Sequence, residues 1–273
     1  MKNKIDKDII IVSAILLSSL LISAIVYFTM PVEITSAHQT WEYKKKETYN
    51  RLLATPILLY HNIDGKGAYS IRLEDLRAQF QMLKDNDIRV ISLSELINRL
   101  ENPVKFGKKS VVITFDDGYS SMYTKLLPLA KEFGYPITLF VHVNAVSENG
   151  KMTWEKLRTL DKEGIDIQCH SISHDDLAKL SSKNNPESKE KLFSELYTSK
   201  KIFELFMNKE MKFFAFPFGR YDLKVVEAAR NAGYLRVFST DYGSNLITNN
   251  NYCLRRHHVK SSFSMDYIKK IIE

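Results

Sequence analysis

The sequence predicts a parallel α/β fold of the (β/α) barrel type, with seven or eight units that need not close completely. Two observations predict it. Short apolar or β-branched runs recur from residue 56 onward, and longer segments of helical period separate them. This alternation is typical of parallel strands joined by crossover helices. Seven or eight such units in roughly 220 residues suit a barrel, and a doubly wound open sheet is the alternative.

Eight apolar runs are the expected strands. They are 57–60, 89–92, 111–115, 137–141, 165–169, 213–216, 235–239 and, with the weakest pattern, 252–259. The expected helices fill the gaps at 73–85, 94–100, 119–133, 153–163, 187–207 and 222–232. Ser94 is expected to cap its helix, and Gly134 and Gly233 are expected to end theirs. The polar segment 181–191 is expected to be a loop.

The N-terminal segment predicts a membrane anchor. Residues 9–28 carry no charge over 20 positions, which is long enough for a helix to cross a hydrocarbon core of roughly 30 Å. Lys2, Lys4 and Lys7 precede this run, and the next charge after it is Glu33. The positive-inside rule then places the N-terminus in the cytoplasm. We therefore expect a single-pass protein of the cell membrane whose remaining chain is extracellular.

This interpretation divides the chain into three parts. They are a cytoplasmic tip and transmembrane anchor at 1–30, an extracellular stalk at 31–55 and a catalytic domain at 56–273. A buried core helix is one alternative for the anchor. A signal peptide cleaved after Ala37 is another, and it would release a secreted protein. The apolar run exceeds the roughly 7–15 residues usual for the core of a signal peptide, which favours an uncleaved anchor.

The composition indicates a globular domain. With 44% hydrophobic residues, a chain of 273 residues can bury a full core, so it is neither disordered nor fibrous. Its net charge of +7 favours anionic surroundings such as an acidic envelope polymer or lipid headgroups. The lysines are scattered rather than gathered in a stripe with aromatic residues, so no nucleic-acid partner is expected. Cys169 and Cys253 are too few for a disulfide-stapled scaffold, and the sequence leaves open whether they pair.

Four polar clusters follow the ends of predicted strands. In parallel α/β folds the carboxyl ends of the strands share one face, and that face carries the site. We therefore expect the four clusters to meet on one rim. They are Tyr60-His61-Asn62, Asp116-Asp117-Gly118, His170-Ser171-Ile172-Ser173-His174 and Pro217-Phe218-Gly219.

Asp116 and Asp117 supply two neighbouring carboxylates. Consecutive side chains on a strand point in opposite directions, but a strand end followed by Gly118 lets the backbone turn so that both reach one cavity. One carboxylate can then bind a metal ion while its neighbour stays free. An ordinary Asp-Asp-Gly turn is the alternative.

His170 and His174 stand four residues apart. In a helical turn, or in a loop resembling one, this spacing presents two imidazoles to a single point. Two neutral imidazoles and a carboxylate form a ligand set that leaves positions open for water. Structural histidines are the alternative for this pair alone. Together with the two aspartates, the pair predicts a metal-dependent hydrolase.

These residues carry a resemblance to a known family. Thr114-Phe115-Asp116-Asp117-Gly118, together with the segment from His170 to His174, resembles the polysaccharide deacetylase (NodB-homology) family, over most of 56–259. The resemblance implies a distorted (β/α) barrel that hydrolyses N-acetyl groups of glycan chains with the help of a divalent metal. It implies that Asp117, His170 and His174 hold the metal and that Asp116 is the base.

Other segments resemble the permuted deacetylases of poly-β-1,6-N-acetylglucosamine, the IcaB and PgaB type. Leu58-Leu59-Tyr60-His61-Asn62-Ile63 carries this similarity and implies that His61 is the general acid. Ala215-Phe216-Pro217-Phe218-Gly219 resembles their Pro-Tyr-Gly loop, with Phe in place of Tyr. Pro217 and Phe218 would then form the oxyanion and substrate site through a backbone N–H. The resemblance also implies a place in an exopolysaccharide synthesis and export complex.

Two departures from these patterns stand out. The histidine pair encloses three residues, as in peptidoglycan and chitin-type deacetylases, whereas the IcaB and PgaB pattern spaces its second ligand one further. This leaves the substrate open between these glycans. Many family members also place an arginine where this chain has Ala215. Arg256 is the candidate to orient Asp116 in its place, and a surface arginine is the alternative.

The remaining choices concern the metal and the reaction. Two histidines and one carboxylate accept Zn, Co, Ni or Fe(II), and zinc is the first expectation. A glycoside hydrolase is a rival, but its two carboxyl groups normally need about 5 Å or more between them. An inactive membrane-tethered glycan-binding homologue is a second rival, and retention of every ligand argues against it. His142, His257 and His258 are expected to be packed or surface histidines rather than ligands.

Overall fold

The computed structural model describes residues 54–102, 109–246 and 252–272. All of them belong to one unit, Arg51–Glu273. The predicted anchor at 9–28 and most of the predicted stalk lie outside the described residues. Within the described part of the chain, no helix has both the length and the apolar character that crossing a bilayer requires.

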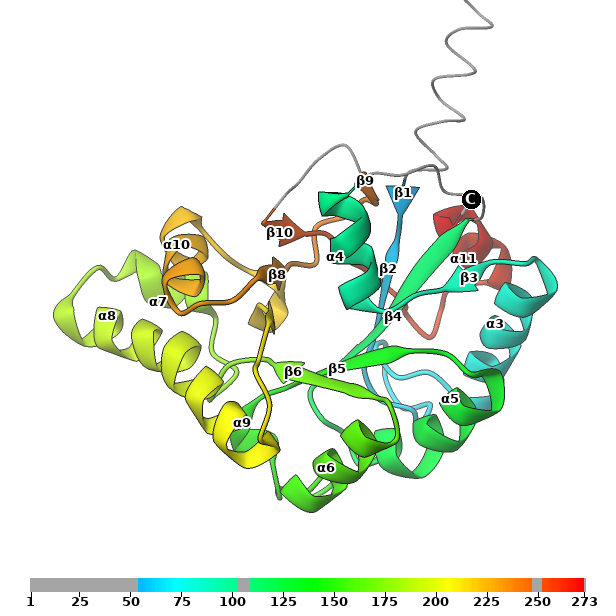
Figure 1. Cartoon of the computed structure of the whole chain (residues 1–273), viewed down its shortest axis with the longest axis horizontal. Helices are drawn as coiled ribbons and strands as arrows, with labels where there is room; N and C mark the ends of the chain where they lie inside the picture. Colours follow the sequence, from blue (N-terminus) through cyan, green and yellow to red (C-terminus); the bar gives the residue numbers. More distant parts are fainter. Residues whose placement is uncertain (1–53, 103–108, 247–251, 273) are drawn as a thin grey trace, which may run out of the picture. The chain divides into compact units, whose positions relative to one another are not determined.

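A curled sheet of parallel strands forms the centre of this unit (Figure 1). Its order is β10-β8-β7-β6-β5-β4-β2-β11, and β3 pairs separately with the start of β4. β1 and β9 pair antiparallel and form a separate two-stranded sheet. The strands are β1 Ala54–Thr55, β2 Ile57–Tyr60, β3 Arg89–Val90, β4 Ser110–Asp116, β5 Ile137–Val141, β6 Asp166–Cys169, β7 Phe213–Ala215, β8 Arg236–Phe238, β9 Asn245–Leu246, β10 Cys253–Leu254 and β11 His257–His258.

The strand order decides between the two expected architectures. From β2 through β4 to β10 it follows the chain without the reversal that defines a doubly wound sheet, so that alternative is wrong. No pairing joins β10 to β11 among the described strands. The sheet is therefore an open, curled half-barrel rather than a closed barrel of seven or eight units.

The chain itself crosses the open side of the sheet. The expected strand 252–259 is in fact two short strands on opposite edges, since β10 pairs with β8 and β11 pairs with β2. Only Arg255 and Arg256 separate them. Residues 253–258 form a bridging segment. It connects the two edges of the sheet through the covalent chain, although no strand pairing joins these edges among the described residues.

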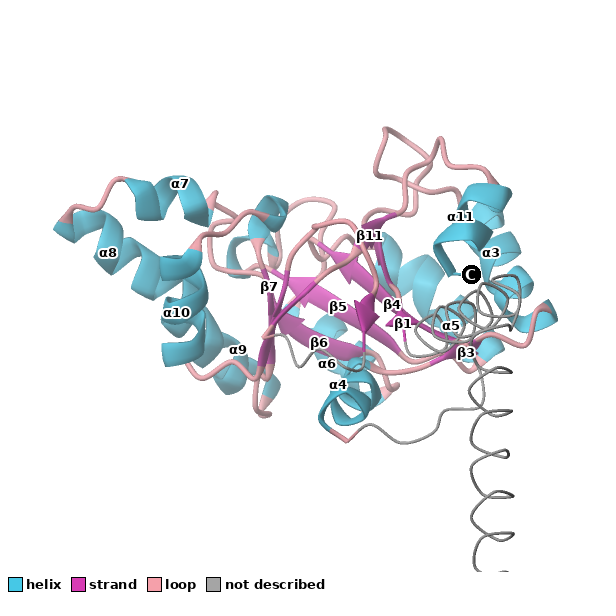
Figure 2. Cartoon of the chain, turned by 90° about the horizontal axis from the view of Figure 1, so that it is seen from above, coloured by secondary structure: helices cyan, strands magenta, loops and turns pink. Residues whose placement is uncertain are grey.

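Helices cover the convex face of the sheet, and α4 lies on its concave side (Figures 1 and 2). The alternation along β4 reflects these two layers. Ile113 and Phe115 belong to the larger core that packs with the outer helices, whereas Val112 belongs to a smaller core with α4. The helices are α3 Leu73–Asp85, α4 Leu93–Glu101, α5 Leu127–Phe133, α6 Trp154–Lys162, α7 Leu177–Ser182, α8 Pro186–Phe193, α9 Ser199–Met207, α10 Leu223–Asn231 and α11 Met265–Ile272.

Helix α4 fills the end of the half-barrel where the strands begin. Leu96 on this helix shares the smaller core with Phe140 of β5. Arg99 donates to Ser110 Oγ at 2.9 Å, at the first residue of β4. Asp116 is the last residue of the same strand. Because α4 fills the end of the half-barrel where the strands begin, space for a site remains at the opposite end, beyond the last residues of the strands.

Local differences from the expected elements have identifiable causes. Ser92, not Ser94, caps α4, because its Oγ accepts from the N–H of Glu95 at 3.1 Å. The expected loop 181–191 is largely helical, since Asn185 begins α8 with a reciprocal capping box. The helices expected at 119–133 and 187–207 are both interrupted by single π-helical turns, Met122–Leu126 and Ser194–Thr198.

Replacement of Leu96 by alanine should lower the free energy of unfolding by about 2–5 kcal/mol, because it leaves a cavity under the sheet. Urea unfolding of the full chain measures this loss. The control is Leu205→Ala, whose side chain is 78% exposed, and which should change stability by less than about 0.5 kcal/mol. Equal losses in the two variants would contradict the role of α4 as a core element.

Candidate active site

The four polar clusters meet in one cavity of about 560 Å³. Each of them contributes at least one side chain to its lining, as the position of the strand ends predicted. The lining includes His61, Asn62, Asp116, Asp117, His170, His174, Phe218 and Gly219, together with Lys66, Tyr69, Tyr119 and His258.

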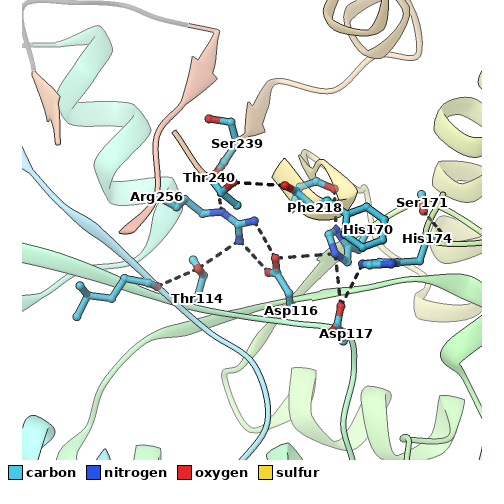
Figure 3. Close-up of polar contacts among 12 residues, drawn as sticks. Thr114, Asp116, Asp117, His170, Ser171, His174, Phe218, Ser239, Thr240 and Arg256 are labelled. Atoms are coloured by element: carbon cyan, nitrogen blue, oxygen red, sulfur yellow. Dashed lines mark hydrogen bonds and ion pairs between the residues drawn. The ribbon is translucent and has the colours of Figure 1, made fainter. Parts of the chain in front are cut away.

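Asp117, His170 and His174 face one another (Figure 3). Asp117 Oδ1 lies 3.6 Å from His170 Nε2 and 3.4 Å from His174 Nε2. One ligand atom from each residue lies within 4.8 Å of the other two. The Nδ1 of His170 lies 2.7 Å from the carbonyl oxygen of Ala215. A carbonyl only accepts, so Nδ1 carries a proton, and Nε2 is the nitrogen that faces Asp117.

The backbone after β4 turns as the sequence predicted. Asp117 has φ 76° and Gly118 has φ 69°, both in the left-handed region. The N–H of Asp117 donates to the carbonyl of Phe140 at 3.0 Å, which fixes the turn to β5. A Cβ at Gly118 would lie 2.8 Å from Val141 Cγ1, so the position requires glycine. The turn brings Asp116 and Asp117 into the same cavity.

The segment from His170 to His174 is a loop and not a helical turn. Ser171 and His174 have φ values of 75° and 61°. Residues other than glycine adopt such values only at a cost in conformational energy. Ser171 Oγ accepts from the N–H of His174 at 3.0 Å and closes the loop on itself. His142 packs its ring against that of His174, with 5.2 Å between centroids, as a packed histidine.

Glu195 fixes the conformation of this loop through hydrogen bonds. It is buried, and its Oε2 accepts from the N–H groups of Ile172 at 2.9 Å and Ser173 at 3.0 Å. Its Oε1 accepts from the Ser173 hydroxyl at 2.6 Å. Glu195 lies in the π-helical turn between α8 and α9, and such turns often occur at functional positions. The two histidines are therefore positioned by a carboxylate more than twenty residues away in the sequence.

Arg256 binds Asp116 through both of its terminal nitrogens (Figure 3). Nη1 donates to Oδ1 and Nη2 donates to Oδ2, each at 2.8 Å. Both residues are buried, and the Nε of Arg256 donates to the Ser239 carbonyl at 3.2 Å. The sequence predicted this pairing, and the alternative of a surface arginine is wrong.

The charges at this site favour ionised carboxylates. Burial alone would raise the pKa of Asp116, but the positive charge of Arg256 and the neighbouring His170 outweigh it, so the net direction is downward. Burial opposes ionisation of Asp117 in the same way, and its contacts with His170 and His174 nevertheless hold its pKa well below the usual range. Both aspartates are therefore charged at neutral pH.

His61 follows β2 and lines the same cavity. Burial lowers its pKa, and the charges of Asp116 and Asp117 oppose this effect only in part. Its ring lies parallel to that of His258, with 5.6 Å between centroids and 6° between planes. Burial also lowers the pKa of His258 to about 4. The structure thus brings His61 into the same cavity as the carboxylates, and it adds His258, which the sequence analysis placed among the packed or surface histidines.

The loop after β7 places Phe218 in the lining of the cavity, next to His174. Phe218 adopts φ 57° and packs edge-on against the His174 ring, with 4.6 Å between centroids. Pro217 is buried and is not among the residues that line the cavity. A Cβ at Gly219 would lie 2.0 Å from Thr240 Oγ1, so only glycine fits. The predicted oxyanion loop therefore borders the site through Phe218.

Residues 104–237 match the model of the polysaccharide deacetylase family. The chain carries a polysaccharide deacetylase domain. One relative, YxkH of Bacillus subtilis (strain 168), is named as a polysaccharide deacetylase. It is 29% identical over 209 residues, which cover 77% of this chain and 72% of the relative. A poly-beta-1,6-N-acetyl-D-glucosamine N-deacetylase of Staphylococcus aureus (strain MRSA252) is 25% identical over 195 residues, which cover 69% and 67%.

Two solved structures share the fold of the deacetylase domain. The Streptococcus pyogenes deacetylase PplD in complex with acetate superposes with a TM-score of 0.72 at 23% identity, and 81% of this chain covers 98% of that one. IcaB from Ammonifex degensii has a TM-score of 0.71 at 20% identity, with coverage of 80% and 97%. The family hydrolyses N-acetyl amide bonds, so the domain is a hydrolase of carbon–nitrogen bonds, as the sequence predicted.

The candidate site contains residues that the sequence analysis did not identify. Glu195 left no signal, because its partners are backbone N–H groups and a serine hydroxyl. Tyr69 and His258 also line the cavity, whereas the sequence analysis did not mention Tyr69 and assigned His258 no role in the site. Cys169 and Cys253 are both free thiols and do not pair.

Replacement of Glu195 by glutamine should weaken metal binding by the Asp117 site about 10-fold to 100-fold, since partners of ligand residues typically contribute this much. An amide cannot accept from all three donors of the loop without presenting its own N–H groups. Titration of Zn²⁺ into the full chain measures the effect. The control is Glu190→Gln, an exposed position on α8. Unchanged affinity in the Glu195 variant would contradict this role.

Replacement of Arg256 by methionine should destabilise the protein by about 3–5 kcal/mol, because a buried carboxylate loses its partner. The double variant Arg256→Met with Asp116→Asn should recover much of that loss, since no buried charge remains. Urea unfolding of the wild type, both single variants and the double variant gives the coupling energy. Additive losses would argue against a coupled pair.

Proposed function

We propose that this domain removes N-acetyl groups from an extracellular N-acetylglucosamine polymer in a metal-dependent reaction, with poly-β-1,6-N-acetylglucosamine as the first candidate substrate. The observation that carries the proposal is that two sets of residues meet in one cavity, namely three potential metal ligands and a buried ion pair. The potential ligands Asp117, His170 and His174 lie beside the pair of Asp116 and Arg256. His61 lines the same cavity.

The residues present fit a divalent metal. One carboxylate oxygen and two imidazole nitrogens form a familiar three-ligand set, and the carbonyl of Ala215 fixes His170 in the tautomer that can ligate through Nε2. Such a set accepts Zn, Co, Ni or Fe(II), and we propose zinc. A bound divalent ion would supply Lewis acidity to the amide carbonyl and to the attacking water.

Asp116 is the proposed general base. Its two oxygens are oriented by Arg256, and each keeps a second lone pair. Oδ2 lies 3.8 Å from His170 Nε2 and so faces the potential metal ligands. Asp116 would take one proton from water as the water oxygen forms a bond to the carbonyl carbon.

His61 is the proposed general acid. The tetrahedral intermediate breaks its carbon–nitrogen bond when His61 donates a proton to the nitrogen, which gives acetate and a free amine on the sugar. A backbone N–H of the loop at Pro217 and Phe218 is the proposed donor to the oxyanion, a contact that is typically worth about 3–4 kcal/mol in the transition state.

The proposed substrate and the proposed cellular location are supported by different observations. The name of the Staphylococcus aureus relative supports poly-β-1,6-N-acetylglucosamine. The three residues between His170 and His174 favour peptidoglycan or chitin oligosaccharides as the second candidates. The uncharged run 9–28 supports a membrane anchor with the domain outside the cell, and a polymer synthesis and export complex is the proposed partner.

Acetate release by the full chain tests this proposal on poly-β-1,6-N-acetylglucosamine, peptidoglycan fragments and chitin oligosaccharides, with and without a chelator. We expect chelator-sensitive acetate with no new reducing ends, which would instead indicate a glycosidase. Asp116→Asn should abolish turnover and keep metal binding, whereas His170→Ala should lose metal affinity. Full activity of Asp116→Asn would show that the base is another residue.

A further inference from the structure

The ring of His61 lacks the partner that orients most reactive histidines. A histidine that transfers protons is usually held by a hydrogen bond from its second nitrogen to a carboxylate or carbonyl. The Nδ1 of His61 is buried without a hydrogen-bond partner among the described residues. Nε2 is therefore the nitrogen that His61 presents to the cavity, and something other than a hydrogen bond must orient the ring.

Two aromatic rings surround His61 on the wall of the cavity. The His258 ring lies parallel to it, with 5.6 Å between centroids. The Tyr69 ring contacts both imidazoles at a tilt near 50°, with centroid distances of 5.3 Å to His61 and 5.2 Å to His258. The Nδ1 of His258 is also buried without a partner. The contact between the histidines is therefore one of stacked faces, with no hydrogen bond joining them.

The backbone makes this stacking rigid. His258 lies in β11, where it pairs in register with Leu59 of β2, and the N–H of Val259 donates to the Leu59 carbonyl at 2.9 Å. His61 follows the end of β2 directly. Two parallel strands thus carry the two rings side by side.

We infer that His258 is a positioning residue that holds His61, through ring stacking, in the orientation needed to protonate the leaving nitrogen. Arg256 and His258 are two apart on an extended segment, so their side chains leave it on the same face. The bridging segment thus orients the base through Arg256 and the acid through His258. This inference rests on the proposed role of His61 as general acid.

Three variants of the full chain test the inference through acetate release. His258→Ala removes the ring and should lower kcat roughly 10-fold to 100-fold with KM nearly unchanged, since a displacement of about 1 Å can cost a hundredfold in rate. His258→Phe keeps a stacked ring and should retain most of kcat. His257→Phe is the control, because His257 points to the other face and contacts Tyr242. It should behave as wild type.

Three outcomes would overturn the inference. His258→Ala with wild-type kcat would show that no positioning is needed. His258→Phe as inactive as His258→Ala would show that a ring nitrogen matters rather than the stacked face. A raised KM with unchanged kcat would make His258 a substrate-binding residue.

A second measurement separates this inference from the proposed function. In NMR spectra of the chain labelled with ¹⁵N-histidine, the ring signals of His61 should shift and broaden in His258→Ala and persist in His258→Phe. Zn²⁺ affinity should stay unchanged in both. A wild-type protein that releases no acetate would contradict the proposed function, and the NMR comparison would still decide whether His258 orients His61.

Discussion

The ion pair between Asp116 and Arg256 is the constraint on which the site depends. Two buried charges are tolerable only when they satisfy each other closely, because each alone would lose its hydration without compensation. Asp116 ends β4, and Arg256 stands between the two strands that form opposite edges of the sheet. The pair therefore fixes the bridging segment over the concave side and sets the distance between the two sheet edges. With these edges fixed, the cavity has a defined shape.

The site also concentrates backbone strain. Among the described residues, eight other than glycine have positive φ, and four of them belong to the site, namely Asp117, Ser171, His174 and Phe218. Such conformations cost on the order of 1–3 kcal/mol each and persist only where surrounding contacts hold them. Glu195 supplies such contacts for the histidine loop, and the turn to β5 supplies them for Asp117. The rigid core formed by the sheet and α4 compensates for the strain.

Much of this arrangement could be predicted from the sequence, and the reasons for the failures are physical. Periodicity located the long strands and helices, because burial on a strand or helix face leaves a pattern. The clusters at Asp116 and His170 were visible because chemistry at strand ends needs unusual residues. Open sheet edges leave no such pattern, so the sequence did not reveal that 252–259 spans two edges. Glu195 and His258 act through backbone donors and a stacked ring, which only the fold brings together.

The order of these parts along the chain has a consequence for biogenesis. Ribosomes make a protein from its N-terminus, and the bridging segment comes after every other strand of the parallel sheet. Until residue 256 has emerged, Asp116, the proposed base, lacks the guanidinium that orients its two oxygens in the folded domain. The proposed active site therefore cannot assemble until nearly the whole domain has been synthesised and the sheet is complete.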